Sequence, residues 1–320
     1  MRVDGVFLLD KAAGASSNRA LQQVRRLYGA DKAGHTGTLD PFATGLLPIC
    51  LGEATKFSQV LLESDKVYRA TARLGEATDT GDCEGAVIAR DGPLEIDQAR
   101  IDAVLAGLVG ALEQVPPMYS ALKHQGQPLY RIARAGGEVE RAPRTVRIHS
   151  LARTAAWRWP DLEFEVCASK GTYVRTLAEQ IAAELGTVAH LVALRRIATG
   201  RFRIEASHGI DSLEGASADT RARWLLPPDA LVADLPAVVV DDEGARRLMQ
   251  GREISAGVLP IVGGVPGAPL RAYHGSASGV ADPAGPGGEF LGLVTLTTSG
   301  SLRVQRLMAT GQAARDSQSA

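Results

Sequence analysis

Cysteine and aromatic residues are scarce in this chain of 320 residues, and neither sign of charge is in excess. The three cysteines, Cys50, Cys83 and Cys167, form no CxxC pair and no cluster with histidine at metal-ligand spacing. A disulfide framework or a structural zinc site would need such spacing. The sequence therefore argues against both, and we expect no bound metal.

Long hydrophobic runs are also missing. The N-terminal apolar run is confined to Val6–Leu9 and is bracketed by Asp4 and Asp10, which does not fit a secretory signal peptide. A membrane-spanning helix needs roughly 20 apolar residues, and no stretch of the chain approaches that length. We therefore expect no membrane association and a location in the reducing cytoplasm.

The charge is balanced overall but unevenly distributed. With 35 basic and 36 acidic residues the net charge is −1, so the total gives no sign of nucleic-acid binding. Between residues 119 and 158, however, eight basic residues face only Glu138 and Glu140, an excess of 8 − 2 = 6, and Tyr119 and Tyr130 lie among them. Arginine interleaved with aromatic rings is typical of surfaces that bind RNA.

A second basic cluster has no acidic residue within it and contains Arg195, Arg196, Arg201 and Arg203. A solvated charged face is the alternative reading for either cluster, because arginine outnumbers lysine 29 to 6 throughout the chain. Two such clusters with aromatic partners favour contact with RNA or DNA.

The run from Gly34 to Phe57, GHTGTLDPFATGLLPICLGEATKF, surrounds the carboxylate of Asp40 with glycine, hydroxyl and apolar residues. Glycines allow tight turns and close approach to a ligand, and Pro41 fixes the chain direction just after the acid. A turn in which Asp40 only caps a helix is an equally open reading from composition alone.

Periodicity indicates a region of mixed helices and strands followed by a β-rich module. We expect a helix after residue 17 that Ser17 or Asn18 caps and Gly29 ends, a helix near Ile101–Leu112, and a strand at 162–168 whose SKGTYVRTL sequel leads into a helix at Leu177–Leu185. Beyond a proline-rich linker, short apolar strands flank a brief helix at Glu243–Gln250. The glycine-rich stretch 263–288 is expected to be a long loop that holds one short strand at Leu270–His274.

Together these segments resemble the TruB-type tRNA pseudouridine synthases. The shared motifs are GVFLLDK, SSN, GHTGTLDPFATGLLPICLGEATKF, DKVYRA, PPMYSALKHQGQPLYRIAR, SKGTYVRTLAEQI and HLVALRRI, in the family's order and at about its spacing over most of residues 5–200. The resemblance implies an α+β fold with a mixed, largely antiparallel sheet and flanking helices. It also implies a catalytic domain at 1–232 with an RNA-clasping thumb near 116–145, a PUA-like RNA-binding domain at 236–311 and a disordered tail at 312–320.

By this resemblance, the protein isomerises the T-loop uridine numbered 55 of tRNA, which it must flip out of the RNA stack. Asp40 matches the family's nucleophile, and Arg175 matches the arginine that keeps this carboxylate ionised against the effect of burial. Tyr68 matches the tyrosine that stacks on the flipped base. Which atom Asp40 attacks is not decided by the resemblance.

The remaining site residues also follow from the resemblance. Tyr173 and Leu194 match pocket positions that contact the substrate, His35 matches the histidine that enters the RNA loop, and Lys11 is retained among the substrate-binding positions although Ala12 replaces the family's usual proline. The RNA-binding residues expected in the thumb are Tyr119, Lys123, Tyr130 and Arg134.

The family implies tRNA as the partner through its T-arm, no cofactor, no obligate protein partner and a monomer. Two alternatives stay open. An Asp among Gly and Thr also occurs in phosphoaspartate-forming hydrolases, but these need Mg²⁺ and further acids nearby, whereas the next acid after Asp40 is Glu53. A non-catalytic tRNA-binding or tRNA-folding module would keep the same basic thumb.

Overall fold

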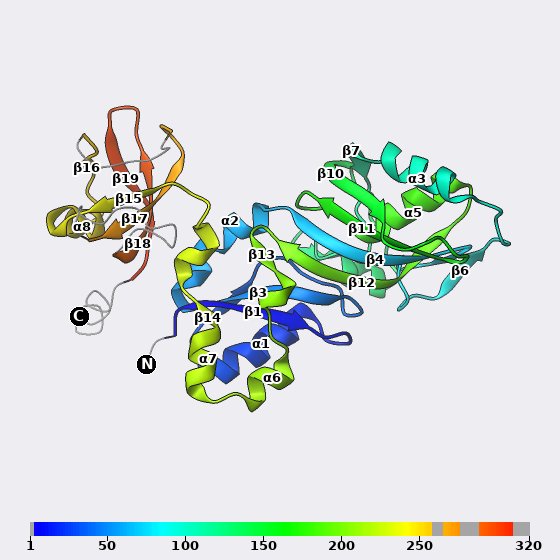
Figure 1. Cartoon of the computed structure of the whole chain (residues 1–320), viewed down its shortest axis with the longest axis horizontal. Coiled ribbons are helices and arrows are strands. Elements are labelled where there is room, and N and C mark those ends of the chain that lie inside the picture. The colour runs from blue at the N-terminus through cyan, green and yellow to red at the C-terminus, as the bar shows by residue number, and fades with distance from the viewer. Residues whose placement is uncertain (1–2, 258–264, 276–287, 310–320) are drawn as a thin grey trace.

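A large mixed sheet forms the scaffold of the catalytic region in the computed structural model, which describes residues 3–257, 265–275 and 288–309 (Figure 1). All its pairings are antiparallel except the parallel contact between β12 and β3, which confirms the expected mixed, largely antiparallel sheet. In order, the strands are β14 (Leu225–Leu226), β1 (Gly5–Lys11), β3 (Thr44–Leu51), β12 (Ala189–Thr199), β4 (Lys66–Leu74), β11 (Asp161–Ala168), β10 (Arg144–Arg153) and β7 (Gly110–Gln114), while β2 (Ala33–His35) pairs with β3 and β13 (Phe202–Arg203) pairs with β12.

Three helices, α1 (Ser17–Tyr28), α3 (Gln98–Gly107) and α5 (Val174–Leu185), cover one face of this sheet. Strand side chains alternate between the two faces. In β4, therefore, Ala70, Ala72 and Leu74 pack into the core beneath the helices, whereas Arg69 and Arg73 lie on the opposite face. The covered face carries the site described below.

Apolar residues of β1 and β3 on the opposite face are covered by η1 (Gly52–Phe57), α2 (Ser58–Glu63) and η3 (Pro228–Val232). Val6, Leu8 and Phe57 belong to this second core, and Leu293 from the C-terminal part joins it. The C-terminal part is therefore packed against the catalytic sheet.

The C-terminal part is a five-stranded sheet with its own apolar core, as expected for a β-rich module. Its elements are β15 (Ala237–Val240), α8 (Asp242–Met249), β16 (Ile254–Ser255), β17 (Pro269–His274), β18 (Glu289–Leu296) and β19 (Ser301–Leu307). β17 confirms the short strand expected at Leu270–His274. The rest of the expected 263–288 loop and the tail at 312–320 lie largely or wholly outside the described residues.

Shorter elements complete the fold. They are the hairpin of β5 (Glu76–Thr78) and β6 (Val87–Arg90), the hairpin of β8 (Lys123–His124) and β9 (Gln127–Pro128), and the helices α4 (Leu129–Arg134), η2 (Ile204–Ala206), α6 (Ile210–Gly215) and α7 (Ala218–Trp224). Within the described ranges, no helix combines the length and apolar character needed to cross a bilayer.

Three element boundaries differ from expectation. The helix expected to reach Leu112 ends at Gly107, because Gly110 adopts a φ of 120° and the chain then pairs with β10 as strand β7. Ser16, not Ser17 or Asn18, caps α1 by accepting the Arg19 N–H, while Gly29 ends this helix in the left-handed region as expected. Helix α5 starts at Val174, earlier than expected.

A buried carboxylate, Glu53, joins the C-terminal part to the catalytic region. Its side chain is 2% exposed and contacts Lys32 Nζ at 2.8 Å and Lys56 Nζ at 2.5 Å. It also accepts the Ala309 N–H at 2.6 Å, and Lys56 donates to the Leu307 carbonyl at 2.8 Å. Burial alone would raise the pKa of Glu53, but the hydrogen bonds from Lys32, Lys56 and Ala309 outweigh it and lower the pKa from 4.5 to about 2.

Glu53→Gln is expected to destabilise the protein at pH 7 by on the order of 3 kcal/mol, because two cations lose their buried counter-charge. A carboxyl whose pKa is lowered on folding stabilises above its unfolded pKa, so the difference from wild type should shrink between pH 4.5 and about 2. Urea unfolding at pH 7 and pH 3 measures this. Glu243→Gln is the control, since Glu243 makes an exposed pair with Arg246. A penalty independent of pH would contradict the charge-based explanation.

Candidate active site

Segments far apart in the sequence line one cavity of about 240 Å³ on the helix-covered side of the sheet. Five of the residues expected at the site line it: Asp40, Tyr68, Tyr173, Arg175 and Leu194. The other lining residues are Thr38, Leu39, Lys66, Ser120, Ala121, Ser169, Gly171, Thr172 and Val174.

An ion pair between Asp40 and Arg175 lies in the wall of this cavity. Arg175 Nε is 3.1 Å from Asp40 Oδ2, and Nη2 is 3.4 Å from Oδ1, so the guanidinium faces both carboxylate oxygens. The arginine side chain is 4% exposed, whereas that of Asp40 is 32% exposed. The carboxylate is thus held from behind and stays accessible from the cavity.

The other donors of Arg175 bind three further groups. Nη1 donates to the Thr80 carbonyl at 2.6 Å and lies 3.3 Å from Asp82 Oδ2, while Nη2 donates to the Tyr119 carbonyl at 2.6 Å. Asp82 is itself buried and accepts the Thr80 hydroxyl at 2.7 Å. One guanidinium therefore connects the Asp40 loop, the acidic turn after β5 and the start of the 119–134 segment.

Asp82 is the functional candidate that the sequence did not reveal. It lies in the acidic turn GEATDTGDCEG, where several carboxylates look alike and only packing distinguishes the buried one. The signal available in the sequence was the position of Asp82 between two glycines in the segment TGDCEG.

Burial has the largest effect on the pKa of Asp40 and raises it. Arg175 opposes this increase, Asp82 adds to it, and Lys11 opposes it. The net result is a pKa above the ordinary value of 3.8. Arg175 thus offsets only part of the effect of burial, since it shares its charge with a second carboxylate.

Both backbone neighbours of Asp40 are fixed by the turn between β1 and α1. The buried Ser17 hydroxyl accepts the Leu39 N–H at 2.8 Å and donates to the Leu39 carbonyl at 2.9 Å. On the other side, the Pro41 carbonyl accepts from the Gly14 N–H at 2.8 Å and from Lys11 Nζ at 3.2 Å. The nucleophile candidate therefore stands between two anchored residues.

Lys11 is 1% exposed, and its ammonium also donates to the Ala12 and Ala15 carbonyls. Burial lowers its pKa to about 8. All three of its hydrogen-bond donors are directed at backbone carbonyls, and Lys11 is not among the residues that line the cavity.

The other cavity residues are positioned by the sheet and by α5. Tyr68 in β4 and Leu194 in β12 lie on adjacent strands and both line the cavity. Tyr173 directly precedes α5, and the buried Gln114 amide fixes its backbone by accepting its N–H at 3.0 Å and donating to its carbonyl at 3.3 Å. Burial raises the pKa of the Tyr173 hydroxyl.

His35 lies in β2, at the start of the Asp40 run, and does not line the cavity. Burial has the largest effect on its pKa and lowers it, and Arg196 lowers it further. Arg196 itself is 1% exposed and donates to the Leu46 carbonyl at 2.7 Å and the Gly37 carbonyl at 3.0 Å. The prediction that Arg196 belongs to an exposed basic cluster is therefore wrong. Its side chain is buried and donates hydrogen bonds to the backbone on both sides of Asp40.

The expected thumb residues lie outside the cavity. Lys123 belongs to the β8–β9 hairpin, Tyr130 and Arg134 belong to α4, and the Arg134 guanidinium lies 5.7 Å from the centre of the Tyr130 ring. Tyr119 differs from these because its carbonyl contacts Arg175 directly. The base of this segment is thus attached to the site while its tip is exposed.

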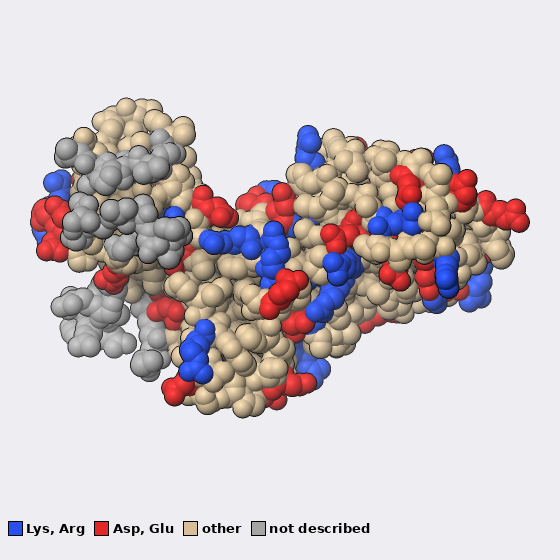
Figure 2. All heavy atoms as spheres, in the orientation of Figure 1, with Lys and Arg blue, Asp and Glu red and all other residues tan. Residues whose placement is uncertain are grey.

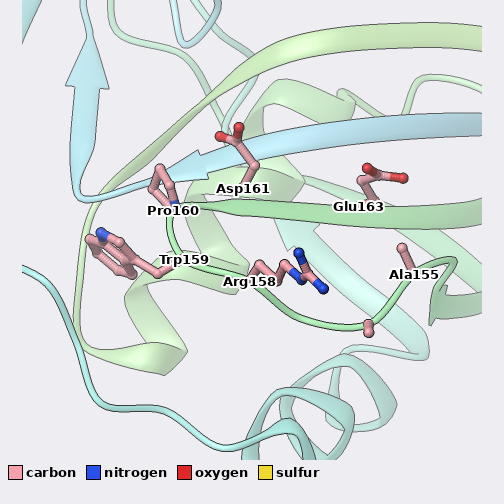
Figure 3. A pocket seen from close by; sticks show the side chains of 7 residues that line it. Ala155, Arg158, Trp159, Pro160, Asp161 and Glu163 are labelled. Carbon is pink, nitrogen blue, oxygen red and sulfur yellow. The ribbon is translucent and has the colours of Figure 1, made fainter.

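Another cavity, of about 440 Å³, lies beside the turn between β10 and β11 and contains none of the expected site residues (Figure 3). Asp161 in its wall is already bound by Arg73, with Nε 2.9 Å from Oδ1. In the part of the chain that the structure describes, no group of three or more His, Cys, Asp or Glu side chains could hold a metal ion.

Two family models match the chain. Residues 25–174 match the N-terminal domain of the TruB family pseudouridylate synthases, and residues 175–233 match the tRNA pseudouridylate synthase B C-terminal domain. A curated relative from Chromohalobacter salexigens, named tRNA pseudouridine synthase B, is 50% identical over 98% of this chain and 97% of its own length. One of the same name from Burkholderia lata is 51% identical over 85% of this chain and 84% of its own length.

Among solved structures, the fold is similar to a chain in the crystal structure of a Cbf5-Nop10-Gar1 complex. The TM-score is 0.69 with 23% identity, and the match covers 95% of this chain and 84% of that chain. This likeness concerns the fold alone, and it extends through the C-terminal module.

Asp82→Asn is expected to lower the pKa of Asp40, because one repelling carboxylate is removed and Arg175 becomes free to interact with Asp40 alone. Carbon-detected NMR titration of the aspartate carboxyls measures this shift, with Asp40→Asn to assign the resonance. Asp79→Asn serves as the control in the same turn. An Asp40 pKa that is unchanged or raised in Asp82→Asn would contradict the shared-arginine arrangement.

Proposed function

The chain belongs to the TruB family of pseudouridylate synthases, and from that premise we propose that it converts uridine to pseudouridine in tRNA, at the T-loop position 55. The observation that carries this proposal is the partly exposed Asp40 carboxylate, held by a buried arginine at the wall of a cavity. The curated relatives named tRNA pseudouridine synthase B support tRNA as the substrate.

The reaction is an isomerisation. The bond between the ribose C1′ and N1 of uracil breaks, the detached base turns, and C5 bonds to C1′ while the proton leaves C5 and N1 gains one. No group is added and no electrons are transferred. A nucleophile, a base-binding pocket and exclusion of water are therefore sufficient, and Asp40 is the nucleophile we propose.

Arg175 and Asp82 set the ionisation of this nucleophile. Burial raises the pKa of Asp40, and the guanidinium opposes that rise and so favours the ionised carboxylate that the nucleophile requires. Asp82 and the Thr80 and Tyr119 carbonyls hold Arg175 in place, so its charge stays aimed at Asp40 during the reaction.

The flipped base is proposed to lie against Tyr68, with Leu194 as an apolar wall and Tyr173 closing the cavity. His35 would stack in the RNA loop as a neutral imidazole, consistent with its lowered pKa. Lys11 is proposed to act on substrate only through the Pro41 backbone, since its donors are directed at carbonyls.

The 116–145 segment is proposed to clasp the RNA through Lys123, Tyr130 and Arg134. Tyr119 is proposed to transmit its position to the site, because the carbonyl of this residue bonds to Arg175. Such phosphate contacts weaken as the salt concentration rises.

Asp40→Ala is expected to abolish the isomerisation, lowering tritium release from C5-labelled uridine in a tRNA transcript by about 10⁴-fold or more, because no other carboxylate lines the cavity. Asp161→Ala, which alters a paired aspartate of the same sheet outside this cavity, is the control. Equal release by Asp40→Ala and wild type would refute the nucleophile assignment. Tight tRNA binding by wild type without any release would favour a binding module.

Ser17→Ala is expected to lower kcat by about 10- to 100-fold with little change in KM for tRNA, because the loss of both bonds to Leu39 misplaces Asp40 but leaves the RNA contacts intact. Steady-state kinetics measures this, and Ser17→Thr, which keeps the hydroxyl, should recover part of kcat.

The matched control is Ser16→Ala, which removes the helix cap next door at a cost of about 1 kcal/mol without touching the Asp40 loop. Equal losses of kcat in Ser16→Ala and Ser17→Ala would mean that the stability of α1, not the position of Asp40, is responsible.

A further inference from the structure

A cavity of about 510 Å³ lies where the catalytic sheet, the 224–233 segment and the C-terminal module meet, and it shares no residue with the catalytic cavity. Leu8 and Phe202 in its lining belong to the core on the sheet face opposite the helices, whereas Trp224 packs against the helix-covered core, so the cavity lies at the β14 edge of the sheet. In Figure 2, lysine and arginine side chains gather in this hollow between the C-terminal module and the catalytic region.

Four arginines and one aspartate line the cavity, so its charge is 4 − 1 = +3: Arg201, Arg203, Arg223, Arg271 and Asp229. None of the four guanidiniums forms an ion pair with a carboxylate of the described residues. Asp229 instead accepts a hydrogen bond from the Tyr273 hydroxyl at 2.6 Å.

Neutral groups hold three of these arginines in place. Arg203 donates to the Gly200 carbonyl at 2.7 Å, Arg223 donates to the Thr220 hydroxyl at 3.0 Å, and Arg271 donates to the Leu235 carbonyl at 2.8 Å. These bonds restrict the side chains without neutralising their charge. Each guanidinium also keeps further donors available, because an arginine carries five.

Three arginines elsewhere on the same sheet do have carboxylate partners. Arg69 pairs with Glu165 at 2.9 Å, Arg73 with Asp161 at 2.9 Å, and Arg195 with Asp10 at 2.7 Å. The four arginines of the cavity lack such a carboxylate partner among the described residues. Cations gathered without a counter-charge repel one another, and a bound anion relieves that repulsion.

The rest of the lining is apolar and aromatic. Trp224 stacks on His208 with ring centres 3.8 Å apart, and Phe202, Leu226 and Pro227 add apolar surface. A cationic rim beside an aromatic wall suits a phosphate attached to a nucleoside better than the carboxylate of an acidic peptide, which needs no flat apolar surface.

We propose that this cavity is a second ligand site, which binds the phosphate of a nucleotide, either as one unit of an RNA chain or as a free nucleotide. Its arginines bind the phosphate, and the wall beside Trp224 contacts the base. The site shares no lining residue with the cavity of Asp40, so its occupant does not compete with the uridine of the proposed isomerisation and the two proposals stand independently.

Calorimetric titration with adenosine 5′-monophosphate tests the site, because this nucleotide lacks the uracil that the catalytic cavity is proposed to take. Wild type is expected to bind it with a Kd of about 1 mM or tighter at fixed ionic strength. The double variant Arg201→Gln/Arg203→Gln and the separate variant Arg223→Gln should each weaken binding, the former by about tenfold. These side chains are exposed, so the fold should persist.

Arg69→Gln is the matched control, since Arg69 is an exposed arginine of the same sheet that already has a carboxylate partner. It should leave the affinity for the nucleotide unchanged. If the control and the double variant lose affinity equally, or if wild type does not bind the nucleotide, the site is refuted.

Kinetics on two substrates distinguish a phosphate that belongs to an RNA chain from one that belongs to a free nucleotide. If KM rises in the double variant for a full-length tRNA transcript but not for a T-arm stem-loop, and the salt slope of tRNA binding falls by roughly 0.7 per lost contact, the site binds RNA. If nucleotide binding is lost while both KM values hold, the ligand is a free nucleotide. Equal KM increases for both substrates would place the contact in the T-arm and overturn a site separate from the catalytic cavity.

Discussion

The buried guanidinium of Arg175 is the interaction on which the site depends. An arginine that is 4% exposed is costly unless nearly every donor has a partner, and here Asp40, Asp82 and the carbonyls of Thr80 and Tyr119 supply those partners. These partners come from three separate stretches of chain, so satisfying one cation brings the Asp40 loop, the acidic turn and the base of the 119–134 segment together. Because this one buried charge needs polar partners from the protein, the segments that supply them are held together at the site.

The sheet gives this assembly its rigidity. Tyr68 and Leu194 are side chains of adjacent strands, and the alternation of strand residues places both on the helix-covered face. The Asp40 loop has no such regular support. It depends instead on single contacts from elsewhere, with Ser17 at Leu39 on one side and Gly14 and Lys11 at Pro41 on the other. Regular structure positions Tyr68 and Leu194 in the cavity wall, and side-chain bonds to the backbone position the Asp40 carboxylate.

The β-rich module could be predicted from local patterns, whereas the sheet class and the pairing of Asp40 with Arg175 could be predicted only through the resemblance to the family that the motifs reveal. The sequence failed where several chemically equivalent residues compete for one role. Ser16 and Ser17 both suit a helix cap, and only the packing assigns Ser17 to the Asp40 loop. In the sequence Arg196 cannot be distinguished from its exposed neighbour Arg195, because adjacent residues of a strand point to opposite faces of the sheet even when they are of the same type.

The sharing of Arg175 between two carboxylates bears on reactivity itself. A carboxylate paired with an arginine of its own would have a low pKa. It would be a weak nucleophile, because an anion that is more stable is less reactive. Full burial without a cation would leave it protonated and inert. With Asp82 taking part of the guanidinium, the pKa of Asp40 lies above its ordinary value, so its anion is more basic than one with an arginine to itself. The second carboxylate thereby sets how strongly the arginine restrains the first.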